Sequence, residues 1–172
     1  MTFTLELDVL ADPAEVFRFV ADFTSTPRWY SAVQHVSHVT GNGGAGTQYE
    51  VHRRLPSGPA VNTVEVADYT EGRVVTFASV AGPTPFAYRY EMHPAGRGTR
   101  LQLEGSISAE GLPGMGHLLG PLAEPLFRRG MQENLGTLKA LLQTRRPASH
   151  RGMNRLCRGF SKRWLTRRYR HA

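Results

Sequence analysis

The sequence is poor in residues that build disulfides, metal sites and membrane spans. Cys157 is the only cysteine, so no intramolecular disulfide can form and a zinc site built from cysteine pairs is excluded. No run of about 18 apolar residues is present, which argues against a membrane-spanning helix. The first residues alternate polar and apolar side chains, and we expect no signal peptide there. A cytoplasmic protein is the resulting expectation.

Acidic residues are absent from the last 29 positions, 144–172, which hold ten lysines and arginines. The 143 positions before them hold 11 basic and 14 acidic residues, for a formal charge of −3. The high isoelectric point of the whole chain, 10.2, therefore results from its C-terminal tail. Binding of nucleic acid, which a basic protein suggests, can apply to that tail alone. We expect one domain over residues 1–143 and a basic tail over residues 144–172.

Common catalytic and cofactor motifs are missing or out of context. No Gly-x-Ser-x-Gly elbow is present. A GxGxxG pattern occupies residues 41–46, but an alternating segment follows it where a dinucleotide site needs a helix. We interpret it as a hairpin loop. The seven histidines are scattered, and His35 and His38 would lie on opposite faces of a strand. We expect no metal and no cofactor.

The periodicity of the chain predicts an α+β domain. Residues 2–9 alternate like a half-buried strand. Asp12 and Pro13 predict the start of a helix, and residues 26–30 predict the opening of a second, short one. Six more strands are expected at 33–40, 47–55, 60–69, 74–80, 86–93 and 99–108. A long amphipathic helix follows over 118–142, perturbed near its start by Pro121 and Pro125.

Five short segments in this order carry a family resemblance: ADPAEVF at 11–17, PRW at 27–29, GAGTQY at 44–49, GTRL at 98–101 and NLGTLK at 134–139. Together they resemble the START-like (SRPBCC) superfamily, in particular its polyketide cyclase/dehydrase and lipid-transport branch. The resemblance covers roughly residues 3 to 143. It implies a helix-grip (START/Bet v 1-like) fold. In that fold a curved seven-stranded antiparallel sheet wraps a long C-terminal helix, with an apolar cavity between them. Here a basic C-terminal tail follows.

Alternation assigns few polar side chains to the inward face of this sheet. Arg53 is the one charged residue on that face, and three tyrosines accompany it. A mostly apolar lining with few polar groups is typical of a small-molecule pocket. The candidate ligand-binding residues are Arg53, Tyr49, Tyr88, Tyr90, Phe86, Trp29 and Asn134.

Each candidate also has a structural interpretation. The tyrosines can be core residues whose hydroxyls bond to backbone. Trp29 and Tyr30 can plug the turn after the second helix or can gate a cavity, and Asn134 can lie at a helix edge. Arg53 needs an acceptor. Either Glu65 or another protein carboxylate supplies it, or a ligand carboxylate or carbonyl does, and both alternatives stay open.

The tail has an amphipathic pattern of its own over residues 150–170. Apolar residues recur at helical spacing from Met153 to Trp164, with basic residues on the opposite side. That combination is typical of helices that lie on anionic membranes. The expected contacts are Phe160, Trp164, Arg155, Arg158 and Lys162. A disordered extension is the alternative. Acidic protein partners, or phosphate backbones bound non-specifically, would also suit the pattern, and we expect no specific nucleic-acid partner.

Two classes of function follow. The first is binding or transport of a hydrophobic small molecule or lipid in an internal cavity, with the tail contacting an anionic surface such as the inner membrane face. The second is a polyketide aromatase/cyclase-type enzyme, in which arginine and tyrosine would position a polyketone and transfer protons; no catalytic residue is assigned. An adaptor with a vestigial cavity is a third. The absence of an inward carboxylate or histidine beside Arg53 favours binding.

Overall fold

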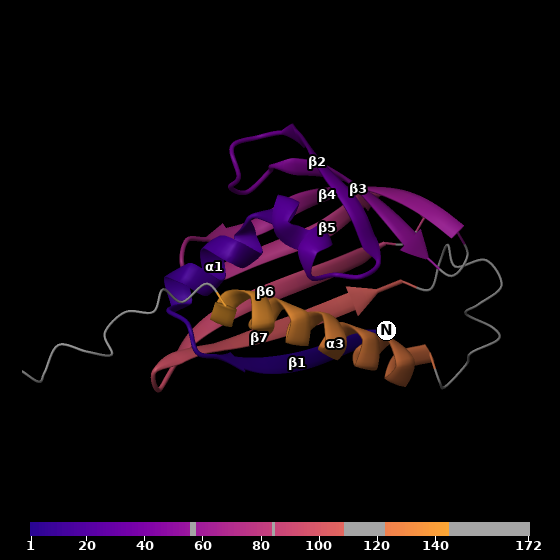
Figure 1. Ribbon diagram of the computed structural model, residues 1–172. Helices are drawn as coiled ribbons and strands as arrows, with labels where there is room; N and C mark the ends of the chain where they lie inside the picture. The colour runs from indigo at the N-terminus through magenta and orange to yellow at the C-terminus, as the bar shows by residue number, and fades with distance from the viewer. Residues whose placement is uncertain (56–57, 84, 109–122, 145–172) are drawn as a thin grey trace, which may run out of the picture.

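The computed structural model describes residues 1–55, 58–83, 85–108 and 123–144, and its described strands form one antiparallel sheet (Figure 1). The sheet order is β1-β7-β6-β5-β4-β3-β2. The strands are β1 (Thr2–Val9), β2 (Val33–Thr40), β3 (Gln48–Leu55), β4 (Gly58–Thr70), β5 (Val74–Ala81), β6 (Phe86–Ala95) and β7 (Gly98–Ile107). The first strand therefore pairs with the last, and the other strands follow as a meander.

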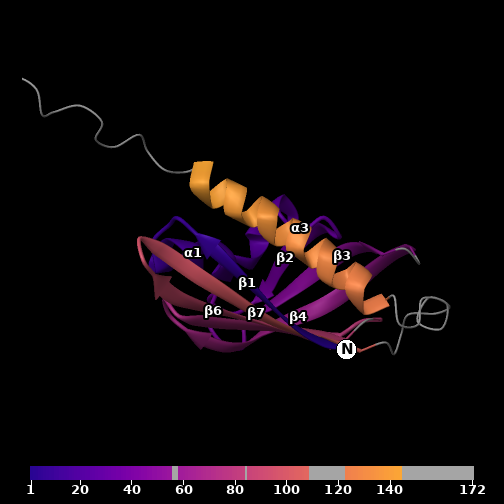
Figure 2. The same ribbon diagram turned by 90° about the horizontal axis from the view of Figure 1, so that it is seen from below.

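The described helices are α1 (Pro13–Ala21), the 3-10 helix η1 (Phe23–Arg28) and α3 (Ala123–Thr144). Helix α1 contacts β5, β6 and β7, whereas η1 contacts β2 and α3 contacts β1. Figure 2 shows α3 crossing the concave side of the curved sheet. The predicted α+β architecture, a seven-stranded antiparallel sheet against a long C-terminal helix, is confirmed. None of the described helices is both long and apolar enough to span a lipid bilayer.

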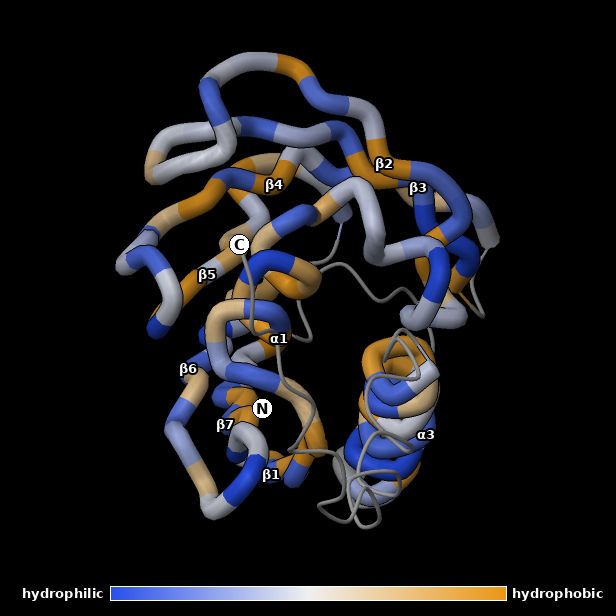
Figure 3. Tube along the Cα trace, turned by 60° about the vertical axis from the view of Figure 1, so that its left-hand side comes forward, coloured by the Kyte–Doolittle hydropathy of each residue, from blue (hydrophilic) through white to orange (hydrophobic). Residues whose placement is uncertain are grey.

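The core lies between the sheet and α3. Leu101 and Leu103 of β7 are fully buried, and α3 covers this region with an apolar stripe. The buried residues of that stripe are Met131, Leu135, Leu138 and Leu142. Hydrophobic and hydrophilic residues alternate along the strands (Figure 3). This alternation is what lets one face of an antiparallel sheet pack while the other meets water.

The first helix begins as predicted, but the second does not. Asp12 caps α1, and its Oδ1 accepts a hydrogen bond from the Ala14 N–H at 2.9 Å. Helix η1 begins at Phe23, three residues before the predicted start at residue 26. The Ser25 hydroxyl donates to the Phe19 carbonyl at 2.9 Å, so the chain turns directly after α1. The ring of Phe23 then stacks on Phe77 with centroids 4.2 Å apart.

The remaining boundaries differ mostly at strand ends. Strand β4 begins at Gly58, which pairs with Leu55, so part of the predicted turn belongs to the sheet. The GxGxxG segment connects β2 to β3, which confirms the hairpin interpretation. Pro125 lies in the first turn of α3, where a proline breaks no hydrogen bond. The predicted start of this helix at residue 118, with Pro121, lies outside the described residues.

Candidate functional site

A small cavity lies between η1 with the segment after it and the inward face of the sheet. Its volume is about 20 Å³. Most of its wall is aromatic, with Phe23, Trp29 and Tyr30 on one side and Phe77, Phe86, Tyr88 and Tyr90 on the sheet; Thr26, Val33, Val51 and Arg53 complete it. Such a space admits about one water-sized atom. The family resemblance implied an apolar cavity between the sheet and the C-terminal helix, whereas no described residue of α3 lines this small cavity beside η1.

Arg53 is the charged residue of this wall. It lies on β3, and only 7% of its surface is exposed. Its guanidinium carbon is 5.1 Å from the centroid of the Phe86 ring, and Nη2 donates to Asn62 Oδ1. Glu65 is not its partner, and that alternative was wrong. Glu65 lies opposite Gln48 in the β3–β4 register, and it accepts a hydrogen bond from that side chain at 2.9 Å.

Asn62 is held so that its oxygen faces Arg53. Its Nδ2 donates to Ser79 Oγ at 2.8 Å and to the Ala81 carbonyl at 3.2 Å. The Nδ2 group of Asn62 therefore donates to β5, and its Oδ1 accepts from the Arg53 guanidinium. Gly82 follows at φ +116°, and a Cβ there would lie 2.6 Å from Asn62 Nδ2. The backbone at this turn thus helps to orient the arginine.

Sequence reasoning missed Asn62, although a signal for it was present. Asn62 shares the inward face of β4 with Ala60, Val64 and Val66, all buried. It is the polar member of an otherwise apolar set, just as Arg53 is on β3. The same alternation would have assigned Glu65 to the opposite face. Applying the two-residue alternation to β4 therefore predicts Asn62 as the partner of Arg53 and excludes Glu65.

Three tyrosines bring hydroxyls to the cavity. The Tyr30 and Tyr88 oxygens are 3.3 Å apart, and either hydroxyl can donate to the other. Burial raises the pKa of Tyr30 and that of Tyr88, and the charge of Arg53 opposes both rises only in part. Burial also raises the pKa of Tyr90. All three phenols are therefore neutral at physiological pH and able to donate hydrogen bonds.

Three buried polar atoms of the wall have no hydrogen-bond partner within the described residues. They are Thr26 Oγ1, Trp29 Nε1 and Arg53 Nε, and no other buried side-chain nitrogen or oxygen in that part of the chain lacks a partner. Each of these atoms can donate a hydrogen bond. An unsatisfied buried polar group costs about 1–3 kcal/mol. All three of these donors belong to residues of the cavity wall.

The structure brings together five of the seven predicted ligand-binding residues: Arg53, Tyr88, Tyr90, Phe86 and Trp29. Trp29 is buried and stacks on Tyr30, with ring centroids 5.9 Å apart. Tyr30 also lines the cavity, although it was considered only as a plug or a gate.

The other two predicted residues are buried outside the wall. Tyr49 packs against Phe23 and His38, with centroids 5.2 and 5.6 Å away. Asn134 does not lie at the helix edge; its Oδ1 accepts from the Ser31 N–H at 3.1 Å and ties α3 to the segment after η1. The predicted membrane contacts Phe160, Trp164, Arg155, Arg158 and Lys162 lie outside the described residues.

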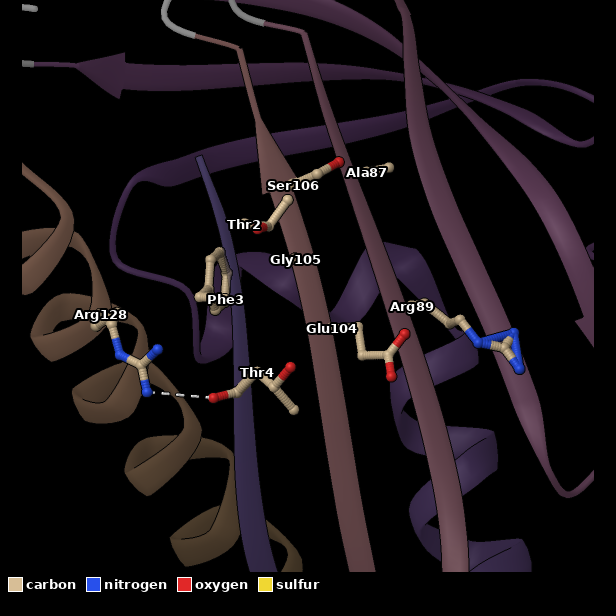
Figure 4. A pocket seen from close by; sticks show the side chains of 9 residues that line it. All are labelled: Thr2, Phe3, Thr4, Ala87, Arg89, Glu104, Gly105, Ser106 and Arg128. Carbon is tan, nitrogen blue, oxygen red and sulfur yellow. Dashed lines mark hydrogen bonds between the residues drawn. The ribbon is translucent and has the colours of Figure 1, made fainter.

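A wider groove of about 720 Å³ lies over β1, β6 and β7 (Figure 4). It is lined by exposed side chains such as Thr4 and Glu104. Arg128 Nη2 donates to the Thr4 carbonyl at 3.3 Å, and Glu104 accepts from Gln102 at 3.0 Å. Arg89 forms ion pairs with Asp68 and Glu91. Because the charged side chains of this groove already have partners, it is less suited to recognise a charged ligand than the cavity.

The histidines within the described residues do not converge on a site. His52 lies 2.7 Å from a Glu50 oxygen, and its ring centroid is 5.8 Å from that of His35. Within residues 1–55, 58–83, 85–108 and 123–144, no three His, Cys, Asp or Glu side chains gather closely enough to hold a metal ion.

Comparisons with known proteins agree with this architecture. The family model for polyketide cyclase / dehydrase and lipid transport matches residues 1–143. A solved protein of Thermus thermophilus superposes with a TM-score of 0.71 at 20% identity, covering 84% of this chain and 98% of its own. A START superfamily protein from Mycobacterium smegmatis gives 0.70 at 16% identity, covering 83% and 97%.

The Zhui aromatase/cyclase from Streptomyces sp. R1128 gives a TM-score of 0.67 at 13% identity, covering 87% of this chain and 97% of its own. No curated protein matches the sequence. At such identities the solved structures establish the helix-grip fold, whereas the family model establishes the lineage. This chain belongs to the polyketide cyclase/dehydrase and lipid transport family of the START-like (SRPBCC) superfamily.

Proposed function

We propose that this protein binds a hydrophobic small molecule in the cavity between η1 and the sheet. The family and the fold fit hydrophobic-ligand binding as well as polyketide cyclase-type function. The observation that carries the proposal is the set of three unpartnered donors on Thr26, Trp29 and Arg53, which share one aromatic wall. Buried polar groups are normally paired, so a ligand oxygen that accepts from them would remove a cost present in the empty protein.

Binding requires part of the wall to move, because about 20 Å³ holds one small atom. The sheet side of the wall is fixed by the β5–β6 backbone pairing. Trp29 and Tyr30 instead follow a single 3-10 helix and reach β2 through a short connection. We therefore assign the displacement to Trp29 and Tyr30, whose rings separate from Tyr90 and Tyr88 as the ligand enters.

A cyclase-type enzyme is the second candidate, and the Tyr30–Tyr88 pair beside Arg53 favours it. Proton transfer is most effective when the pKa of the catalytic group lies near the working pH. Burial moves the pKa of both phenols away from that range. The described wall also contains no carboxylate or imidazole that could accept a proton. Binding is therefore the function that these residues support better.

Filling the cavity is expected to weaken the binding of a neutral hydrophobic probe. Val33 of β2 is buried in the wall, whereas Val39 of the same strand is 56% exposed. Val33→Phe should weaken the binding of N-phenyl-1-naphthylamine at least about tenfold, because the added ring takes the space the probe needs. Val39→Phe should leave it unchanged. Fluorescence titration of the two variants and the unsubstituted protein measures the difference.

Equal affinity of all three proteins would place the probe elsewhere and contradict the proposal. Since extra volume in a core costs about 1–3 kcal/mol, thermal unfolding of Val33→Phe is measured alongside. A variant that melts cooperatively but still binds the probe as tightly as the unsubstituted protein also contradicts the cavity assignment.

The basic tail adds a membrane proposal to this function. Residues 150–170, with Phe160 and Trp164 opposite Arg155, Arg158 and Lys162, would lie on an anionic bilayer. Each basic residue near such a surface contributes about 1 kcal/mol. We expect the full chain to float with phosphatidylserine vesicles and to remain behind with phosphatidylcholine vesicles. A version ending at Gln143 should float with neither, and equal behaviour of the two proteins would refute the tail's role.

A further inference from the structure

The charge of the ligand can be inferred from the surroundings of Arg53. We propose that the ligand carries an ionised oxygen, as in a carboxylate or an ionised enol, and that this oxygen is the missing counter-ion of Arg53. The inference rests on the proposed function, because it concerns the same cavity. It narrows the ligand from any hydrophobic molecule to an organic anion with an apolar body.

Arg53 is a buried cation whose contacts are neutral. Asn62 accepts one of its hydrogen bonds, and Phe86 lies beneath the guanidinium. No ion pair joins Arg53 to a carboxylate within the described residues. An arginine stays protonated in proteins, and an uncompensated buried charge is strongly unfavourable. An anion entering this cavity would remove that penalty, whereas a neutral ligand would not.

The orientation of the guanidinium leaves one edge for a ligand. Asn62 Oδ1, the single oxygen of that amide, accepts from Nη2, and the Nδ2 group of Asn62 donates to Ser79 and Ala81 of β5. Arg53 Nε has no partner in the described chain. An ionised oxygen is a strong acceptor for such a charged donor, and hydrogen bonds of this kind are roughly twice as strong as neutral ones.

The other polar groups of the wall favour an acceptor too. Trp29 Nε1 can only donate, and the hydroxyl of Thr26 can turn to donate. Of the bonded Tyr30–Tyr88 pair, one hydroxyl donates to the other, which leaves one proton for a ligand. A carboxylate only accepts, so it matches every one of these groups. A ligand amide of the same shape has an NH₂ group in place of one oxygen, and this group would face hydrogen-bond donors of the wall. The wall therefore discriminates between an anion and its neutral isostere.

Calorimetric titration of the full chain with 2-naphthoate and 2-naphthamide tests this discrimination. The two probes share a ring system and differ in charge. We expect 2-naphthoate to bind at least about tenfold more tightly, the effect of one charge-assisted hydrogen bond. Arg53→Met should weaken 2-naphthoate at least about tenfold and leave 2-naphthamide within about twofold. Arg54→Met, which changes the exposed neighbour on the same strand, should alter neither.

The possible results separate this inference from the proposed function. Equal binding of the two probes, lost in Val33→Phe, would overturn the anionic head group and keep the hydrophobic site. Failure of both probes to bind would overturn both. An anion held by the basic tail would bind Val33→Phe and Arg53→Met as tightly as the unsubstituted protein, and this result would also overturn the inference. If Arg53→Met does not fold, Arg53→Lys serves instead, because it keeps the charge and should keep the preference for 2-naphthoate.

Discussion

Raising the pH from 9.5 to 11 is expected to lower the free energy of unfolding by about 1 kcal/mol for each phenol that stays protonated in the folded protein. The cause is the burial of Tyr30, Tyr88 and Tyr90, which raises the pKa of each phenol in the folded protein. In the unfolded chain these phenols ionise near pH 10. As the pH rises above that value, the unfolded state loses protons that the folded state keeps. Stability is therefore complete below about pH 10 and falls above it.

Urea denaturation at pH 9.5, 10.3 and 11 measures this loss. Tyr88→Phe and Tyr90→Phe should each reduce it by about 1 kcal/mol, since each variant removes the ionisation of one buried phenol. Only Lys139 and Lys162 are lysines, so few groups other than tyrosines titrate in this range. Unchanged stability between pH 9.5 and 11 would contradict the burial of the three hydroxyls. So would absorbance at 295 nm showing all tyrosines of the folded protein ionising near pH 10.

Gly82→Ala is expected to destabilise the protein by about 3 kcal/mol. A residue with a side chain at φ +116° is strained by about 1–3 kcal/mol. The new Cβ would also lie 2.6 Å from Asn62 Nδ2 and 2.6 Å from the Val61 carbonyl oxygen. Because Asn62 orients Arg53, displacement of the amide should weaken 2-naphthoate binding as well.

Gly72→Ala is the matched control for the backbone strain. Gly72 has φ +72°, and a Cβ there would meet no atom within 4 Å. It should cost about 1 kcal/mol, the usual penalty of a left-handed conformation. The difference between the two variants then reports the contacts with Asn62 and with the Val61 carbonyl, together with any extra strain at the larger φ of Gly82. Equal losses in urea denaturation would show that the Asn62 amide gives way freely, and the proposed orientation of Arg53 would be unsupported.

The alternation of side chains along the strands correctly predicted several of the residues that line the cavity. It assigned Arg53, Tyr88 and Tyr90 to one face, and the structure buries all three around a single cavity. It did not separate Tyr49 from that set. Tyr49 faces the same side of the sheet, but it packs against Phe23 and His38 beyond the wall. Alternation specifies a face, whereas the position along and across a curved sheet depends on which helix covers each strand.

The size of the cavity could not be predicted from the sequence, because alternation does not say how closely the inward side chains pack. An inward face rich in tyrosine and phenylalanine is compatible with an open pocket or with a packed core. Which of the two results depends on where the rings of Trp29 and Tyr30 lie, and these rings pack against Tyr90 and Tyr88 across the cavity. In this structure the packed arrangement results, and the remaining space admits about one water-sized atom.

The pairing of β1 with β7 has a consequence for how the chain folds. Thr2 lies opposite Ser106, and the N-terminal amino group donates to the Ile107 carbonyl at 3.0 Å. During synthesis at about 5–20 residues per second, β1 must wait roughly 5–20 s for its neighbour in the sheet. The β2–β7 meander forms by local hairpins, and long-range pairings are slower. We therefore expect β1 to dock last, with Phe3 and Leu5 uncovered on the nascent chain until then.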